Sequence, residues 1–554
     1  MRILMMMAVA VSVTACSSGG KDGTKKVSAS GTSTYGIATD GASHVAYILN
    51  AGPSYGTSGE LHIADAAGKD TKIATGINIG TFGFSSDGKG LLFVQQNSDP
   101  TDANLQWVDV TNPTAPPKMV FATGMQTVGI TSDPKSPKIA APLLQQGFQS
   151  PSGRFYIVGQ GATPDLHVID MTTGTDVFSR DNGAFHYLEL VLPNDVMVFQ
   201  DAVGGNGGIS GGAGVQTLFW TDLTSGSPTS TQIDERTGNY TPTGDNKTLV
   251  YQRADTRELF AWDATARPAT GTKIASDTLN FAVGGSGPVA YVGSDGSFHV
   301  VGIDGKAILD VAAATAVADP NSPVYISDDG ADAYYFQHVD SQDSQGTLMH
   351  LSVSAGAAPS KVADAASLGD VHPLPDGVLL YLANVDMTGA TGDAFKSARD
   401  GSGATALGTK VPIGFLSIQT PPGAGSGSAM WVSAHLTGAT ESMSQQLIDA
   451  VRNISGGLEL TTTSGTTMID PNARLGQYQI SDDFSNLVYV GGSAFDSTVD
   501  NYVGALEFVP VATPTMKPAK PLLTGVSEVG PVVKRALFVN APKASSPGVY
   551  FVSF

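Results

Sequence analysis

A chain of 554 residues with 41% hydrophobic and only 14% charged residues can bury several cores, and it is neither a disordered polyelectrolyte nor a coiled coil. Its 66 Gly and 31 Pro, together with a preference for Asp over Glu, favour turns over helices. The net charge of −20 argues against nucleic acid and anionic lipid as partners, because both need clustered Lys and Arg.

The N-terminus has the pattern of an export signal. A positively charged start precedes an apolar run over residues 3–13, which is shorter than the roughly 20 residues that span a bilayer. The run ends in Val13-Thr14-Ala15-Cys16, which resembles the bacterial lipobox. The resemblance implies cleavage after Ala15 and attachment of diacylglycerol to the thiol of Cys16, the chain's single cysteine. We therefore expect a lipoprotein signal peptide over residues 1–15 and lipidation at Cys16.

Residues 16–34 are rich in Gly, Ser, Thr and Lys and lack apolar periodicity, which is typical of a flexible tether. Ser17 after the cysteine resembles lipoproteins that are exported to the outer membrane of Gram-negative bacteria. We expect a location in the bacterial cell envelope, with the membrane contacted through the N-terminal lipid, and in the outer membrane if the host is Gram-negative. An ordinary secretory signal with an incidental cysteine is the alternative.

The rest of the chain repeats, and two markers define the repeat. The first is a short apolar strand that ends in an aspartate able to cap the following turn. These aspartates are spaced by 44, 61, 52, 41 and 41 residues and are Asp65, Asp109, Asp170, Asp222, Asp263 and Asp304. Such a period is typical of repeat architectures.

The second marker is a turn followed by a hydrophobic strand. Phe84-Ser85-Ser86-Asp87-Gly88 precedes an apolar run at 91–94, and similar sequences occur at 150–158, 326–336, 374–382 and 480–490. These sequences resemble the F-S-P-D-G-x-x-L-x-F unit of TolB-like and WD40-like (PD40-type) propeller repeats. The resemblance implies an all-β chain, a β-propeller of four-stranded blades, over residues 35–554.

Ten or eleven such units exceed the four to eight blades of a typical ring. Either two propellers lie in tandem, with a seam near residues 305–325, or the units form one large ring. The apolar C-terminal residues 548–554 suit a strand that closes a ring by pairing with the first blade. Residues 441–454 have apolar positions at helical spacing and predict a single amphipathic helix.

Candidate chemistry in the sequence is sparse. His62, His167, His299 and His350 occupy the same kind of strand in four units, and equivalent positions on separate blades diverge, so we do not expect them to share a metal ion. Two G-x-S-x-G sequences, at 52–56 and 208–212, lack the strand-turn-helix context of a nucleophile. We therefore predict no catalytic residue.

Acidic loops are the weak candidates for a cofactor. Asp340 and Asp343, and similarly residues 99–102, offer oxygen ligands at the short spacing that Ca²⁺ prefers. Solvated hairpin turns explain these residues equally well, and no other cofactor is expected.

The sequence favours a lipid-anchored, non-catalytic binding platform for a protein or cell-wall partner. TolB-like propellers bind partner proteins on a ring face, but the helical domain ahead of their propeller is not evident in this chain, so their partners are not carried over. An envelope hydrolase or lyase with its site in the propeller funnel is an alternative, and a carbohydrate- or calcium-dependent adhesin is another. A pocket of titratable residues with perturbed pKa values would favour an enzyme.

Overall fold

The structure is a computed structural model. It describes residues 23–28, 37–41, 43–49, 58–85, 87–96, 103–122, 125–129, 138–142, 148–160, 165–180, 190–192, 194–202, 216–285, 287–312, 318–319, 322–354, 356–374, 377–387, 391–412, 433–437, 455–462, 465–474, 477–499, 501–516, 521–533 and 535–554. The expected signal peptide with Ala15 and Cys16, both G-x-S-x-G sequences and the expected helix at 441–454 lie outside these residues. Within them, every regular element is a β-strand, and no helix could cross a membrane.

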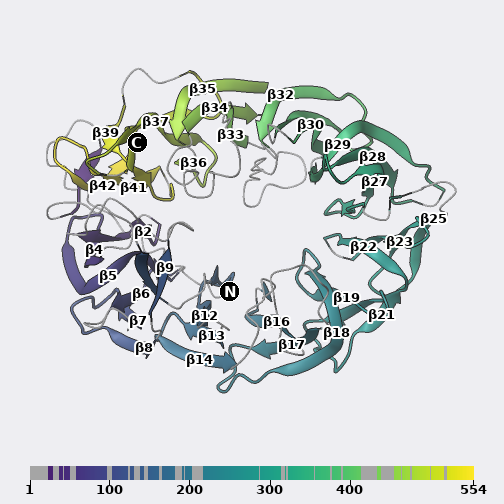
Figure 1. Cartoon of the computed structure of the whole chain (residues 1–554), viewed down its shortest axis with the longest axis horizontal. Helices are drawn as coiled ribbons and strands as arrows, with labels where there is room; N and C mark the ends of the chain where they lie inside the picture. The colour runs from purple at the N-terminus through teal and green to yellow at the C-terminus, as the bar shows by residue number, and fades with distance from the viewer. Residues whose placement is uncertain are drawn as a thin grey trace, which may run out of the picture.

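The strands form a β-propeller. Consecutive antiparallel sheets follow one another in chain order around one ring, and the purple first strands lie beside the yellow last strands (Figure 1). Among the described residues, three seven-stranded sheets contain two blades each, and four four-stranded sheets and one three-stranded sheet contain one blade each, which makes eleven. The all-β propeller expected from the sequence is thus confirmed.

The first half of the ring contains the first two seven-stranded sheets and the blade between them. The strands of the first sheet are β2 (Ile37–Thr39), β3 (His44–Leu49), β4 (Ser58–Asp65), β5 (Asp70–Phe84), β6 (Gly90–Gln96), β7 (Ala103–Asp109) and β8 (Lys118–Ala122). A hairpin follows, formed by β9 (Met125–Gly129) and β10 (Lys138–Pro142). The next blade has β11 (Phe148–Gln149), β12 (Phe155–Gln160), β13 (Asp165–Asp170) and β14 (Thr175–Arg180). The second long sheet has β15 (Leu190–Val191), β16 (Val196–Ala202), β17 (Gln216–Asp222), β18 (Thr231–Pro242), β19 (Thr248–Arg253), β20 (Leu259–Asp263) and β21 (Thr272–Ala275).

The second half returns to the start of the ring. One blade has β22 (Thr278–Val283), β23 (Val289–Gly293), β24 (Phe298–Val301) and β25 (Ala307–Val311). The third long sheet has β26 (Tyr325–Ile326), β27 (Asp332–Asp340), β28 (Gln345–Ser352), β29 (Ser360–Pro373), β30 (Val378–Asp386), β31 (Thr391–Ala398) and β32 (Thr405–Pro412). The last strands are β33 (Ser433–Thr437), β34 (Ser455–Thr462), β35 (Gly465–Arg474), β36 (Tyr478–Ile480), β37 (Asn486–Asp496), β38 (Asn501–Pro510), β39 (Leu523–Val526), β40 (Glu528–Val529), β41 (Ala536–Ala541) and β42 (Gly548–Ser553).

The hydrophobic core lies between neighbouring blades. The second strand of a blade is buried on both faces, as in β23 and β41, whose five and six residues are all buried. This explains their continuous apolar sequences, because a strand covered on both faces does not alternate. One cluster joins β22–β25 to the next sheet and includes Val311, Ala318, Val324 and Tyr335. The described residues of 305–325 therefore contribute to a core that both neighbouring sheets share.

Adjacent blades in a long sheet share one strand, which bends at a residue with positive φ. We call these corner residues, and they are Gly76 in β5 (75°), Arg236 in β18 (56°) and Ala365 in β29 (50°). Asp277 (56°) and Gly525 (74°) occupy the same place after β21 and in β39. The next residue is fully buried in each case, so the corner turns the strand from the outer edge of one blade into the next blade.

Both sequence markers form the turns that were predicted. In the first, five of the six strand-ending aspartates accept the backbone N–H of the residue two positions later, as Asp109 does from Thr111 at 2.8 Å. The sixth, Asp65, accepts the N–H of Lys69 at 2.8 Å. In the second, Ser85 Oγ donates to Asp87 Oδ1 at 2.7 Å and accepts the N–H of Gly90 at 2.8 Å. Side chains therefore replace backbone partners in both turns.

The two ends of the chain close the ring. The strand β1 (Thr24–Lys26) pairs antiparallel with β42, with Lys25 opposite Phe551. Val27 then donates its N–H to the carbonyl of Val549 at 2.9 Å and is buried against Tyr47 and Phe538. Here the structure differs from the flexible tether expected over residues 16–34, because residues 24–28 complete the final sheet. The pairing covers the edge that β42 would otherwise expose.

Candidate functional site

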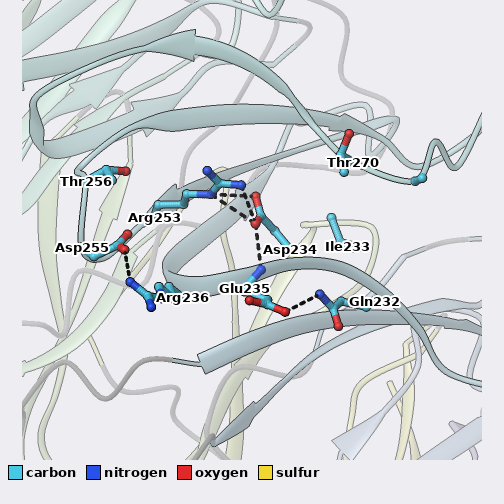
Figure 2. A pocket seen from close by; sticks show the side chains of 10 residues that line it. Gln232, Ile233, Asp234, Glu235, Arg236, Arg253, Asp255, Thr256 and Thr270 are labelled. Atoms are coloured by element: carbon cyan, nitrogen blue, oxygen red, sulfur yellow. Dashed lines mark hydrogen bonds and ion pairs between the residues drawn. The ribbon is translucent and has the colours of Figure 1, made fainter.

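A polar pocket of about 430 Å³ lies where β18 passes from one blade to the next (Figure 2). Its lining comes from the outer part of β18, from the turn after β19 and from the loop before β21. The lining residues are Gln232, Ile233, Asp234, Glu235, Arg236, Arg253, Asp255, Thr256, Ala269 and Thr270. Most are polar or charged, which distinguishes this pocket from the apolar cavities typical of small-molecule sites.

A buried carboxylate organises the base of the pocket. Asp234, which is 7% exposed, accepts hydrogen bonds from Nη2 of Arg253 at 2.8 Å and from the hydroxyl of Tyr251 at 2.7 Å. Its Oδ1 also accepts the backbone N–H of Glu235 at 2.7 Å. The guanidinium of Arg253 lies flat over the ring of Phe260, 4.6 Å from its centre. Asp234 therefore fixes one edge of the Arg253 guanidinium, and Phe260 contacts one of its faces.

The rim of the pocket contains a second pair of charges. Arg236, the corner residue of β18, donates from Nη1 to Oδ2 of Asp255 at 3.0 Å. Gln232 donates from Nε2 to Oε1 of Glu235 at 3.3 Å. Figure 2 shows the Arg236–Asp255 pair and the Arg253–Asp234 pair as separate contacts in the same pocket. The rim thus presents hydrogen-bond donors and acceptors close together.

At this site the pKa values of three groups are shifted further from pH 7. Hydrogen bonds to Asp234 raise the pKa of Arg253, and the hydrogen bond from Arg236 lowers the pKa of Asp255. Burial, and then the hydrogen bond to Asp234, raise the pKa of the Tyr251 hydroxyl. A general acid or base needs a pKa near the working pH, and the shifts move these three groups away from it.

The pocket residues depart from the repeat. Counting two positions back from each corner residue, Asp234 corresponds to Ala74, Ala275, Ala363 and Leu523. Sequence analysis did not predict this site, because Asp234 and Arg253 come from different strands. In the sequence, the site is marked only by an Asp where the other corners have an apolar residue. Such a replacement in an otherwise apolar position is the signal that could have revealed it.

A related position occurs in β35. Asp470 follows an isoleucine, as Asp234 does, and is 1% exposed. Its Oδ1 accepts the N–H of Asn472 at 2.7 Å, whereas its Oδ2 has no hydrogen-bond partner among the described residues. Gly491 occupies the place that Arg253 has in β19, and a Cβ there would lie 2.4 Å from Oδ2 of Asp470. This corner therefore lacks the guanidinium that organises the pocket.

The four histidines of the repeated strand are placed on four different blades. Each ring packs against an aromatic side chain and bonds to a carboxylate of its own blade or the adjoining turn. The pairs are His62 with Asp70 (3.1 Å), His167 with Asp176 (2.7 Å), His299 with Asp310 (2.7 Å) and His350 with Asp332 (2.7 Å). In the part of the chain that the structure describes, no three His, Cys, Asp or Glu residues are grouped to hold a metal.

Ser297, His299 and Asp310 form hydrogen bonds in the order of a catalytic triad. Nε2 of His299 lies 2.6 Å from Oγ of Ser297, and Nδ1 lies 2.7 Å from Oδ1 of Asp310. However, Ser297 also donates its hydroxyl hydrogen to Asp295, which lowers the pKa of that carboxyl. The hydroxyl hydrogen is thus directed away from the imidazole, and Ser297 is buried. This geometry serves the turn before β24 rather than nucleophilic attack.

The acidic loop candidates form a hairpin turn. Asp340 ends β27, and its Oδ1 accepts the N–H groups of Gln342 and Asp343 at 2.9 and 3.3 Å. Asp343 is exposed beside it. These bonds use the carboxylate of Asp340 within the turn. Residues 99–102 lie outside the described residues.

The comparisons with known proteins give distant structural likenesses. No protein-family profile and no curated protein sequence matches the chain. Prolyl endopeptidases match over 76% of this chain and 53% of theirs, at 12% identity and a TM-score of 0.32. The propeller domain of the Trilobed protease from Pyrococcus furiosus matches over 68% of this chain and 97% of that domain, at 10% identity and a TM-score of 0.26. BamB from Moraxella catarrhalis matches over 55% and 80%, at 14% identity and a TM-score of 0.24.

This chain thus spans about half the length of the prolyl endopeptidases that it matches. At these identities and scores, the likenesses carry no argument about activity. The propeller assignment rests on the strand order and pairing of this chain itself.

Proposed function

We propose that the chain is a lipid-anchored β-propeller of the bacterial cell envelope that acts as a non-catalytic binding platform for a protein or cell-wall partner. The observation that carries this proposal is the geometry of the pocket beside β18, where Asp234 holds Arg253 in place and the rim presents charged donors and acceptors. Arg253 and Asp255 are held charged, and the hydroxyl of Tyr251 is held neutral, by their neighbours. Such groups recognise a partner by hydrogen bonds without exchanging protons.

The proposed anchor is compatible with the closure of the ring. The strand β1 begins at Thr24, eight residues after Cys16, and eight extended residues span at most roughly 28 Å. A lipid on Cys16 would therefore keep the closing sheet close to the bilayer. The partner surface would be presented from the membrane at a short distance.

Site-specific photo-crosslinking in cells tests the platform. A diazirine amino acid at Thr270, which lines the pocket, is expected to form a reproducible adduct. The same residue at Thr405, which is exposed on another blade, is the matched control and is expected to form none. Equal labelling at both positions, or none at either, would contradict a binding role for the pocket.

The anchor has a separate test. Cys16→Ala is expected to remove acylation and to release the protein from the membrane fraction. Metabolic labelling with a clickable fatty acid and fractionation measure both effects. Unchanged membrane association of the variant would contradict the proposed lipoprotein.

A further inference from the structure

We propose that the pocket beside β18 binds a neutral, polyhydroxylated carbohydrate. This inference rests on the proposed function, because it names the ligand class of the same platform. It draws on the unused hydrogen-bonding capacity of the pocket, its charge balance, its polar lining and its rigidity.

The pocket offers free donors and acceptors on one surface. Arg253 uses Nε and Nη2 for Asp234, and its Nη1 has no partner among the described residues. Arg236 uses Nη1 for Asp255, which leaves Nε and Nη2 available in the described part of the chain. The side chains of Arg253 and Arg236 are 36% and 62% exposed, so a ligand can reach them. A sugar hydroxyl both donates and accepts, and it matches such a mixed surface.

The charge balance disfavours an anion. Two guanidiniums face three carboxylates, those of Asp234, Glu235 and Asp255. Asp234 and Asp255 each bond to one of the arginines, and Glu235 accepts a bond from the neutral amide of Gln232. An anionic ligand would meet a site that already has a net negative charge, inside a chain of net charge −20. A neutral ligand avoids this repulsion.

Most residues of the lining can form hydrogen bonds with a hydroxylated ligand. Ile233 and Ala269 are its apolar members, and Ile233 is only 2% exposed because it packs in the core. The remaining lining residues carry amide, hydroxyl, carboxylate or guanidinium groups. The volume of about 430 Å³ lies within the roughly 300–1,000 Å³ of small-ligand sites. A short segment of a glycan therefore fits both the size and the chemistry.

The site is rigid before any ligand binds. Asp234 holds one edge of the Arg253 guanidinium, and Phe260 supports its face. Groups held in this way lose little entropy on binding, which matters for weak, hydrogen-bonded ligands such as sugars. The equivalent positions Ala74, Ala275, Ala363 and Leu523 cannot hold an arginine in this manner, so among the described corners the arrangement is particular to this one.

Binding of neutral tetrasaccharides to the full mature chain tests the inference. Cellotetraose, maltotetraose and chitotetraose are the neutral probes, and a heparin-derived tetrasaccharide is the anionic comparator, each titrated by isothermal calorimetry. We expect saturable binding of at least one neutral probe and none of the comparator. Glu235→Gln is expected to weaken binding about tenfold, because it removes a charged acceptor. Asp364→Asn is the matched control, since Asp364 is exposed and precedes the corner residue Ala365 as Glu235 precedes Arg236.

Four results would overturn the inference. Binding of the sulfated probe alone would show an anion site, and equal losses in both variants would place binding outside the pocket. Mass spectrometry could also find peptide and no sugar in the Thr270 adduct, together with no binding of the neutral probes. This result would mean that the platform binds a protein rather than a carbohydrate. The absence of both an adduct and any binding would contradict the platform as well.

Discussion

At the scale of single residues, Asp234 shows how a repeat can acquire a specific site. Its sister positions contain alanine or leucine, which need no hydrogen-bond partner inside the fold. A buried carboxylate needs one, and Arg253 and Tyr251 supply four hydrogen bonds to it. The arginine then has one remaining nitrogen, Nη1, to offer at the pocket. A substitution inside the fold has thus produced a polar surface.

We predict that Arg253→Leu lowers the free energy of unfolding by about 3 kcal/mol, because it leaves Asp234 buried without its cation. The double variant Asp234→Ala/Arg253→Leu is expected to recover most of this loss, since it restores the alanine of the sister blades. Urea denaturation of the two single variants and the double variant gives the coupling energy. Additive losses would contradict a direct pairing of the two residues.

At the scale of elements, the corner residues decide where one blade ends and the next begins. We predict opposite effects at two of them. Gly525→Ala is expected to destabilise the chain by about 2 kcal/mol or more, because a Cβ at φ 74° would lie 2.2 Å from the backbone carbon of Lys543. Ala365→Gly is expected to raise stability by up to about 1 kcal/mol, since it relieves a non-glycine residue at φ 50°. Thermal unfolding measures both, and equal signs would contradict the corner geometry.

The turn at Ser481-Asp482-Asp483, which belongs to the second repeat marker, gives a pH-dependent prediction. Hydrogen bonds from Ser481 and Ser485 lower the pKa of Asp483 to about 2. Because the folded pKa lies below the unfolded value of about 3.9, the carboxylate stabilises the fold above pH 4, and this contribution is lost as the pH falls toward 2. Asp483→Asn is expected to be less stable than the parent at pH 6, with a difference that shrinks below pH 4. A difference independent of pH in urea titrations would contradict this assignment.

The sequence predicted the turns, whose contacts lie between residues close in the chain. It did not predict the shared strands or the pocket, whose contacts lie between different strands. The turns at Asp109 and Ser85 use partners within five residues, so the motif alone indicates them. The shared strands were not predicted, because a corner can be formed by Arg236 or Ala365, which have no turn signature. The pocket was missed for the same reason, since Asp234 meets Arg253 only across paired strands.

At the scale of the whole molecule, each blade is stabilised mainly by the apolar faces of its neighbours, so the ring needs closure. Residues 24–28 close the ring: β1 pairs with β42, and Val27 is buried between the first and last blades. The proposed lipid anchor would enter the fold at this same place. Membrane attachment and ring closure would then involve one short segment of the chain.

We predict that removing β1 opens the ring locally before it unfolds globally. A chain that begins at residue 29 loses the pairing with β42 and the bond from Val27 to Val549, so its β41 and β42 amides are expected to exchange with deuterium much faster. A chain that begins at Gly23 retains β1 and is the control. The amides of β23, which lies in a different part of the ring (Figure 1), are expected to stay protected in both chains. Uniformly faster exchange would mean that the ring unfolds as a single cooperative unit, and unchanged exchange would mean that neighbouring blades hold β42 without β1.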